Sequence, residues 1–179
     1  MGQALAVALV FPRPGEREEL VFDRLYRECR DDVYAFVAGL LRDRSAAEEV
    51  TAQAFERAYR KRDSFNPQRG SARAWLFGIA RNAALDELRR RGRNAALVSD
   101  PVDETAAHGE DVAEAALRRR AVAAAIRSLN GRDRELVALK FFAGLDNAEI
   151  ARVVGITESN VGTRLHRALE KLRKEVDDG

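Results

Sequence analysis

Cysteine and histidine are nearly absent from this 179-residue chain, which contains one cysteine and two histidines. With Cys29 as its only thiol, the chain can form no internal disulfide, as is usual for proteins of a reducing cytosol. A structural zinc site needs about four Cys or His ligands, so a Cys/His metal centre is essentially excluded. Glycine-rich phosphate loops and nucleophile–base motifs are also missing, so we expect no cofactor and no enzymatic activity.

The sequence also lacks long hydrophobic runs. Its only sustained apolar stretch is ALAVALVF, Ala4 to Phe11, far shorter than the ~20 residues of a membrane-spanning helix. No Lys or Arg precedes this stretch, so it lacks the charged start of a signal peptide. We expect residues 1–19 to be a frayed or loosely docked tail, or an extension from a misassigned start, on a cytoplasmic protein that does not insert into membranes.

Proline and aromatic residues are scarce, with four prolines and 7% aromatics. Ala, Leu, Arg and Glu dominate, which favours helices over sheets. We therefore predict an all-α fold. Its charges are segregated: residues 1–91 and 118–174 are net basic, whereas residues 92–117 carry six acidic residues and one basic. Two basic blocks around an acidic spacer suggest two surfaces for polyanions, although a solvated linker would have the same composition.

Three helices are predicted between residues 20 and 91. Apolar residues recur at three- and four-residue steps from Phe22 to Leu41, and Cys29 lies on this apolar face as a buried structural thiol. Ser45 opens a capping-box pattern for a second helix that ends near Arg62.

Residues 62–71, RDSFNPQRGS, break the helical pattern, and Ser71 can cap a third helix that runs to about Arg91. Trp75, Leu76, Ile79, Ala83 and Leu88 are predicted on or near the buried side of this helix. Trp75 could also stack on a nucleic-acid base, but its apolar neighbours favour a core position.

From residue 92 to 111 the pattern gives way to Pro, Gly, Ser and acidic residues, which indicates a flexible acidic linker. Helices resume over about 112–129, 132–142, 147–154 and 157–176. The last two are joined by a tight turn at Gly155, which predicts a helix-turn-helix. The fold class is thus two small helical domains, residues 20–91 and 112–179, joined by the linker.

The exposed face of the final helix carries residue types that hydrogen-bond base edges and phosphates, and the first two turns of a recognition helix enter the major groove. The face offers Ser159, Asn160, Thr163, Arg164, Arg167, Lys171 and Lys174. An ordinary surface helix with a cationic face is the alternative, but the capped preceding helix and the Gly turn favour DNA binding. His166 is interpreted as a packing or phosphate-side residue.

Two stretches resemble a known family. The stretch SLNGRDRELVALKFFAGLDNAEIARVVGITESNVGTRLHRALEKLRK resembles domain 4 of the bacterial extracytoplasmic-function (ECF) sigma factors. The stretch AEEVTAQAFERAYRKRDSFNPQRGSARAWLFGIARNAALDELRRR resembles their domain 2. The resemblance implies a dissociable subunit that directs core RNA polymerase to promoters.

For the C-terminal domain, the resemblance implies that the final helix reads the −35 element. The implied contacts are Glu158, Ser159, Asn160, Gly162, Thr163, Arg164, Arg167 and Lys171, with Lys174 beside them. The first of these are candidate base readers, whereas Arg167, Lys171 and Lys174 suit phosphates. Many relatives carry Lys where this chain has Gly162, an interior glycine that weakens a helix by about 1 kcal/mol relative to Ala.

For the N-terminal domain, the resemblance implies recognition and melting of the −10 element, with an extruded base held in the loop before the third helix. The implied contacts are Ser64, Phe65, Asn66, Arg69, Arg81, Asn82, Asp86 and Arg89. Glu48, Glu49, Gln53 and Arg57 on the second helix would bind polymerase, although this helix departs from the family's Asp-Leu-x-Gln-Glu pattern. The resemblance further implies contacts to the clamp of the largest polymerase subunit and the flap of the second-largest, and control by an anti-sigma factor.

Three alternatives remain open. A helix-turn-helix activator that never joins core polymerase would leave residues 65–91 without a task. A helical adaptor that binds an acidic partner would share the basic faces. An enzyme is the least favoured class.

Overall fold

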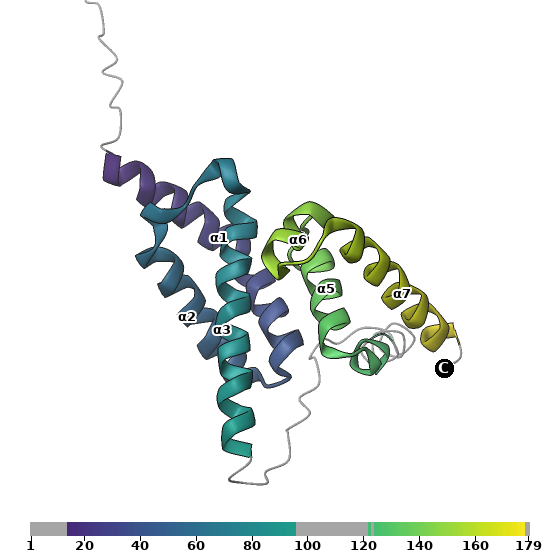
Figure 1. The fold of residues 1–179 in the computed structure, drawn as a ribbon. Coiled ribbons are helices and arrows are strands. Elements are labelled where there is room, and N and C mark those ends of the chain that lie inside the picture. The colour runs from purple at the N-terminus through teal and green to yellow at the C-terminus, as the bar shows by residue number, and fades with distance from the viewer. Residues whose placement is uncertain (1–13, 96–121, 123, 178–179) are drawn as a thin grey trace, which may run out of the picture.

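The computed structural model describes residues 14–95, 122 and 124–177, and this part of the chain contains helices and no strand (Figure 1). The all-α prediction is therefore confirmed. The N-terminal unit contains the helices α1 (Pro14–Leu41), α2 (Arg44–Arg60), η1 (Arg62–Ser64), η2 (Pro67–Arg69) and α3 (Ala72–Ala95). The C-terminal unit contains a helical turn over residues 124–128, then α5 (Gly131–Phe141), α6 (Asn147–Val154) and α7 (Glu158–Asp177).

Three predicted segments lie largely outside the described residues. Of the predicted helix 112–129, residues 112–121 and 123 are outside. Of the predicted tail, residues 1–13 are outside, and α1 already begins at Pro14. Of the predicted linker, residues 96–111 are outside. The other four residues belong to α3, which continues to Ala95, beyond its expected end at Arg91.

The N-terminal unit is a three-helix bundle in which each helix packs against the other two. Its core combines large side chains from α1 and α3, such as Phe36, Leu76 and Phe77, with alanines of α2 and α3. The small alanine side chains allow the helix backbones to approach closely. Cys29 is buried in this core, as predicted. Leu88, expected near the buried side, is 38% exposed.

The start of α2 differs from the prediction. Asp43, not Ser45, is the N-cap residue: its carboxylate accepts a hydrogen bond from the backbone N–H of Ala46 at 3.0 Å. The same carboxylate accepts a hydrogen bond from Arg91 of α3 at 2.8 Å. Aspartate satisfies an unpaired N–H at a helix start as well as serine does, and here its position also joins α2 to α3. By contrast, Ser71 caps α3 as predicted and accepts a hydrogen bond from the N–H of Ala74.

The predicted helix-turn-helix is confirmed in the C-terminal unit. Asp146 and Glu149 form a complete capping box at the start of α6. Gly155 then ends α6 with φ of 78°, in the left-handed region that favours glycine. The turn brings α7 back across α6, so that Ile150 and Ala151 are buried together with Val161, Leu165 and Ala168. Leu169, expected in this contact, is 40% exposed, and Ala168 occupies the buried position instead.

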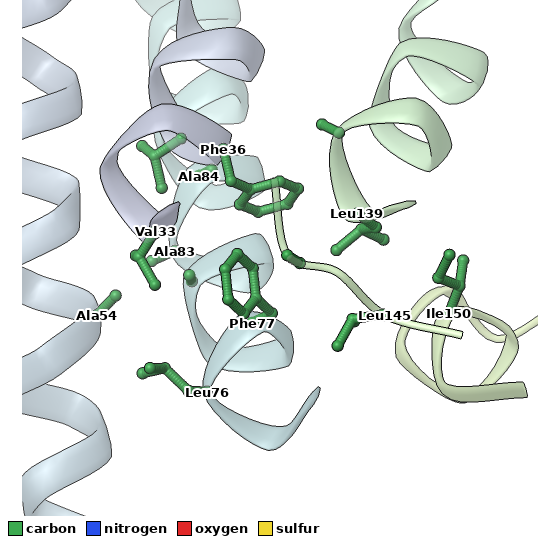
Figure 2. Close-up of a cluster of buried hydrophobic side chains, with 14 of the residues drawn as sticks. Val33, Phe36, Ala54, Leu76, Phe77, Ala83, Ala84, Leu139, Leu145 and Ile150 are labelled. Atoms are coloured by element: carbon green, nitrogen blue, oxygen red, sulfur yellow. The ribbon is translucent and has the colours of Figure 1, made fainter. Parts of the chain in front are cut away.

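The two units pack directly against each other, which the sequence did not predict. Their buried apolar residues form one continuous cluster. Figure 2 shows Phe36 and Phe77 of the N-terminal unit beside Leu139 and Leu145 of the C-terminal unit. In Figure 1, α6 lies against α3, while α7 is on the side away from the N-terminal unit. The arrangement in which these units are packed together is called the closed arrangement below.

The cap at Asp43 gives a stability test. Replacing Asp43 with Ala should lower the free energy of unfolding by about 1 kcal/mol, because the N–H of Ala46 loses its partner. Ser45→Ala, at the residue the sequence pattern favoured, should change it by less than about 0.5 kcal/mol. Urea denaturation followed by circular dichroism measures both, and equal effects would contradict Asp43 as the cap.

The loss of stability in Asp43→Ala should depend on pH. The hydrogen bond from Ala46 holds the pKa of Asp43 below its ordinary value, and Arg91 acts in the same direction. A carboxyl whose pKa is lowered by folding contributes stability above its unfolded pKa of about 4. We expect the difference between wild type and Asp43→Ala to be full at pH 7 and to shrink as the pH falls below about 4.

Candidate nucleic-acid interface

The first turns of α7 present an exposed polar face. Thr157 precedes the helix, and its hydroxyl accepts a hydrogen bond from the N–H of Asn160 at 3.3 Å. Such a cap leaves the following side chains free to point outward from a fixed helix start. The predicted −35 residues that are exposed on α7 are Glu158, Ser159, Asn160, Thr163, Arg167, Lys171 and Lys174. The structure thus brings these residues together on one helix.

Arg164 is placed differently from the other predicted −35 residues. Its Nε and one terminal nitrogen donate to the same oxygen of Asp133 on α5, at 2.9 and 2.7 Å. Both side chains are partly buried. Arg164 therefore connects α7 to α5, and this structural role was not predicted.

Gly162 lies on the side of α7 that faces the start of α6. A methyl group at this position would lie 3.7 Å from the side-chain nitrogen of Asn147, which is ordinary van der Waals contact. Gly162 is also outside the left-handed region of φ. Neither crowding nor backbone conformation therefore requires glycine at this position.

The loop between α2 and α3 holds four of the predicted −10 residues. Asn66 caps η2 by accepting a hydrogen bond from the N–H of Gln68 at 2.9 Å. The ring of Phe65 packs against that of Trp75, with 5.5 Å between centroids. Ser64 donates to the carbonyl of Lys61. Trp75 is partly buried against the core, so it lies between the core and Phe65 of the loop, consistent with the predicted core position.

Arg69 and Arg81 meet the C-terminal unit. The carbonyl of Arg69 accepts a hydrogen bond from Arg152 of α6 at 3.3 Å. Arg81 donates to the carboxylate of Glu135 on α5 at 2.6 Å, and only 18% and 8% of these side chains are exposed. A buried ion pair of this kind is costly to break by removing one partner. In the closed arrangement, the Arg81 guanidinium is therefore already paired with Glu135.

The other predicted −10 residues, Asn82, Asp86 and Arg89, are exposed on α3. Asp86 pairs with Arg89 at 3.1 Å and with Arg57 of α2 at 3.5 Å. Arg57, predicted to bind polymerase, is thus linked to the predicted −10 surface.

The remaining predicted polymerase-binding residues lie along the outer side of α2. Glu48 and Glu49 are exposed and Gln53 is partly exposed. Gln53 donates to Glu49 at 3.0 Å. Glu48 also lines a groove between α1 and α2 that contains Tyr26, Tyr34 and Phe55. The groove adds an apolar surface beside the acidic side chains.

Arg73 was missed by the sequence analysis. Its guanidinium donates to Asp32 and to the sulfur of Cys29 on α1, and to the carbonyls of Phe142 and Ala143 in the C-terminal unit. Burial raises the pKa of the Cys29 thiol, and the nearby Arg73 cation only partly offsets this effect. The sequence did hold one signal, since Arg73 and Arg81 are spaced with Phe77 at steps of four on an otherwise apolar face.

No group of three or more His, Cys, Asp or Glu side chains is arranged to hold a metal ion in the described part of the chain. Across those same residues, no helix is both long and apolar enough to cross a membrane.

Comparison with known proteins identifies both units. The family model for Sigma-70 region 2 matches residues 25–94, and the model for Sigma-70, region 4 matches residues 119–172. The ECF RNA polymerase sigma factor SigL of Mycobacterium tuberculosis is 32% identical over 162 residues, covering 90% of this chain and 92% of that protein. This chain belongs to the ECF sigma factors.

Two further relatives differ in length. BldN of Streptomyces coelicolor is 34% identical over 160 residues, and the match spans 88% of this ECF sigma factor but only 61% of BldN. SigK of Mycobacterium bovis is 29% identical over 172 residues, with 92% and 90% covered. A regulator that had only a helix-turn-helix would not match region 2, so the activator alternative loses its support.

Solved structures show the same fold. The sigma factor RpoE, solved in complex with the anti-sigma factor NepR from Bartonella quintana, matches with a TM-score of 0.76 and 24% identity. This match covers 88% of the present ECF sigma factor and 97% of that chain, so it spans both units. CnrH, solved with the cytosolic domain of CnrY, gives a TM-score of 0.65 at 24% identity, covering 89% and 90%.

The position of Arg164 generates a test of its role. Arg164→Ala should lower the free energy of unfolding by about 1–2 kcal/mol, because a charged hydrogen-bonded pair with Asp133 is lost. Asp133→Asn should lower it by a similar amount, and the double variant should lose less than the sum. Arg167→Ala, on the exposed face, serves as the control and should change stability by less than about 0.5 kcal/mol. Fully additive losses in urea denaturation would contradict the pair.

Proposed function

We propose that this ECF sigma factor binds core RNA polymerase in the cytoplasm and directs it to promoters by reading two DNA elements. Support comes from the two region matches in one chain, together with an exposed polar helix face in each unit. The proposal describes a binding subunit rather than an enzyme, because its residues position DNA and polymerase and transform no substrate.

The C-terminal unit, within residues 112–179, would read the −35 element with α7. Ser159, Asn160 and Thr163 are candidate base readers, because exposed hydroxyl and amide groups on a helix start can reach base edges in the major groove. Arg167, Lys171 and Lys174 would contact phosphates, which fixes the register of the helix on the duplex.

Arg164 would contribute to −35 recognition indirectly. Its pairing with Asp133 orients α7 on α5, so its substitution would impair −35 recognition through the position of the helix. A direct base contact would require this ion pair to loosen on binding.

The N-terminal unit, within residues 20–91, would bind polymerase and the melted −10 element. The loop at residues 62–71 and the exposed Asn82, Asp86 and Arg89 of α3 supply amide, aromatic and charged groups. Such groups stack on unpaired bases and hydrogen-bond their edges. The outer side of α2, with Glu48, Glu49, Gln53 and Arg57, would contact the polymerase clamp, and the C-terminal unit the flap.

An anti-sigma factor is the regulator we propose. The anti-sigma factor NepR is bound to the sigma factor RpoE in a solved structure that shares this fold.

The central experiment mixes the purified chain with core polymerase and a promoter library and sequences the transcripts. We expect start sites that share −35 and −10 sequences and that disappear without the chain. Tight binding of the chain alone to duplex sites, without promoter-specific starts, would instead indicate an activator.

Gly162 provides a sharper test of −35 reading. Gly162→Ala should raise the free energy of unfolding by up to about 1 kcal/mol, because α7 gains helix propensity and the methyl group has room. It should leave −35 preference unchanged. Gly162→Lys should change −35 preference or the salt dependence of initiation, because it adds a cation near the DNA. An effect of Gly162→Lys on stability alone would make the glycine a tolerated helix defect.

A further inference from the structure

Thr163 lies at the centre of the exposed face of α7. Val161 and Leu165, two positions before and after it, are both buried. Successive residues of an α-helix are about 100° apart, so a residue two positions from each of them lies on the opposite side of the helix. Thr163 is itself exposed and belongs to the second turn of α7. It is therefore in the part of a recognition helix that enters the major groove.

The hydroxyl of Thr163 is engaged within its own helix. Its Oγ1 donates to the backbone carbonyl of Ser159, one turn earlier, at 3.0 Å. A hydroxyl has one proton, so a threonine that bonds back to the preceding turn has none left to donate to a base. The methyl group on the same Cβ takes no part in this hydrogen bond. Thr163 thus presents a methyl group in the middle of a polar helix face.

The residues around Thr163 allow the start of α7 to approach the base edges closely. Gly162, beside it in the sequence, adds no side chain, and Ser159 is short and exposed. Arg167, one turn after Thr163, is long, exposed and cationic, and it suits a phosphate at the edge of the groove. Short side chains in the first turns and long cations further along fit a helix whose start lies nearest the bases.

A methyl group is itself a feature of the major groove. Thymine displays its C5-methyl group there beside the O4 acceptor, whereas cytosine, adenine and guanine display donors and acceptors without a methyl. Apolar contact between a threonine methyl and the thymine methyl is one of the side-chain pairings by which helices read sequence. The group that Thr163 presents therefore matches one base of the four.

We propose that Thr163 selects a thymine in the −35 element through contact between the two methyl groups. The hydroxyl fixes the orientation of the side chain by its bond to Ser159, so the base is read by the methyl group rather than by the hydroxyl. This selection rests on the proposed function, in which α7 reads the −35 element.

Two substitutions separate the methyl group from the hydroxyl. Thr163→Val keeps the methyl and replaces the hydroxyl with a second methyl of similar size. Thr163→Ser keeps the hydroxyl and removes the methyl. Valine, serine and threonine have similar helix propensities, so both variants should retain α7, which circular dichroism checks. A third variant, Asn160→Ala, removes another exposed candidate base reader and leaves Thr163 in place.

The matching change is made in the DNA. Each full-length chain is assembled with core polymerase, and the complex is bound to a labelled duplex promoter found in the transcript assay. Every thymine of the −35 element, on either strand, is replaced in turn with deoxyuridine, which lacks the methyl group and keeps the base-pairing edge. Competition with unlabelled promoter, at a temperature where the duplex stays closed, gives the relative affinities.

We expect deoxyuridine at one −35 position to weaken binding of wild type about fourfold, the loss that follows when one methyl group stays unburied. Thr163→Val should have the same sensitivity at that position. Thr163→Ser should bind the thymine promoter about fourfold more weakly than wild type and should no longer distinguish thymine from deoxyuridine there. Asn160→Ala should weaken binding to both promoters by equal factors, because its side chain is independent of the methyl contact.

Three results would overturn the proposal. In the first, Thr163→Ser is as sensitive to deoxyuridine as wild type at every position. In the second, wild type is sensitive at none. In the third, Thr163→Val loses affinity while Thr163→Ser keeps it, which would make the hydroxyl the group that reads the base.

The transcript assay separates this proposal from the proposed function. If wild type directs promoter-specific initiation but Thr163→Ser keeps the sensitivity to deoxyuridine, thymine selection by Thr163 is wrong and the sigma-factor function stands. If wild type directs no promoter-specific initiation, the proposed function fails and thymine selection fails with it.

Discussion

The contacts of one guanidinium, that of Arg73, tie together three parts of this structure. It binds Asp32 and Cys29 of α1 and packs over Phe77 of its own helix. It also donates to the carbonyls of Phe142 and Ala143, which follow α5. A partly buried cation needs several acceptors at once, and no single helix can supply them. The position of the C-terminal unit on the N-terminal unit is therefore fixed by the same group that stabilises the N-terminal bundle. The second cation on this face, Arg81, depends on the same alignment for its pairing with Glu135.

Much of the fold could be predicted from the sequence because helix periodicity and caps are local signals. The limits of α6, the cap at Ser71 and the turn at Gly155 all follow from residues within a few positions of one another. The cap at Asp43 was missed because Ser45 offers an equally good local pattern, whereas in the structure Asp43 binds both the N–H of Ala46 and Arg91 of α3. The packing of the two units was missed for a similar reason. It depends on Arg–Glu and Arg–carbonyl contacts between residues about 50 to 70 positions apart, and such charges are usually solvated in isolated helices.

In the candidate site, too, local patterns predict some residues and only tertiary contacts reveal the roles of others. The exposed residues of α7 follow from helical phase, so their grouping on one face was predictable. Arg164 has the same residue type and nearly the same phase as Arg167, yet it is paired with Asp133 whereas Arg167 is exposed. A one-dimensional pattern cannot separate an arginine that binds DNA from one that holds the helix in place, because both require a long cationic side chain beside an apolar stripe.

The paired donors of Arg73 and Arg81 on α3 also affect how much of the protein is bound nonspecifically to chromosomal DNA. Guanidinium groups attract any nucleic-acid backbone, and chromosomal DNA offers a very large excess of nonspecific phosphates. When Arg81 is neutralised by Glu135 and the donors of Arg73 are used by carbonyls, these two cations contribute little to such binding. The packed units thus reduce retention on random DNA and leave a larger share of the molecules free to meet polymerase.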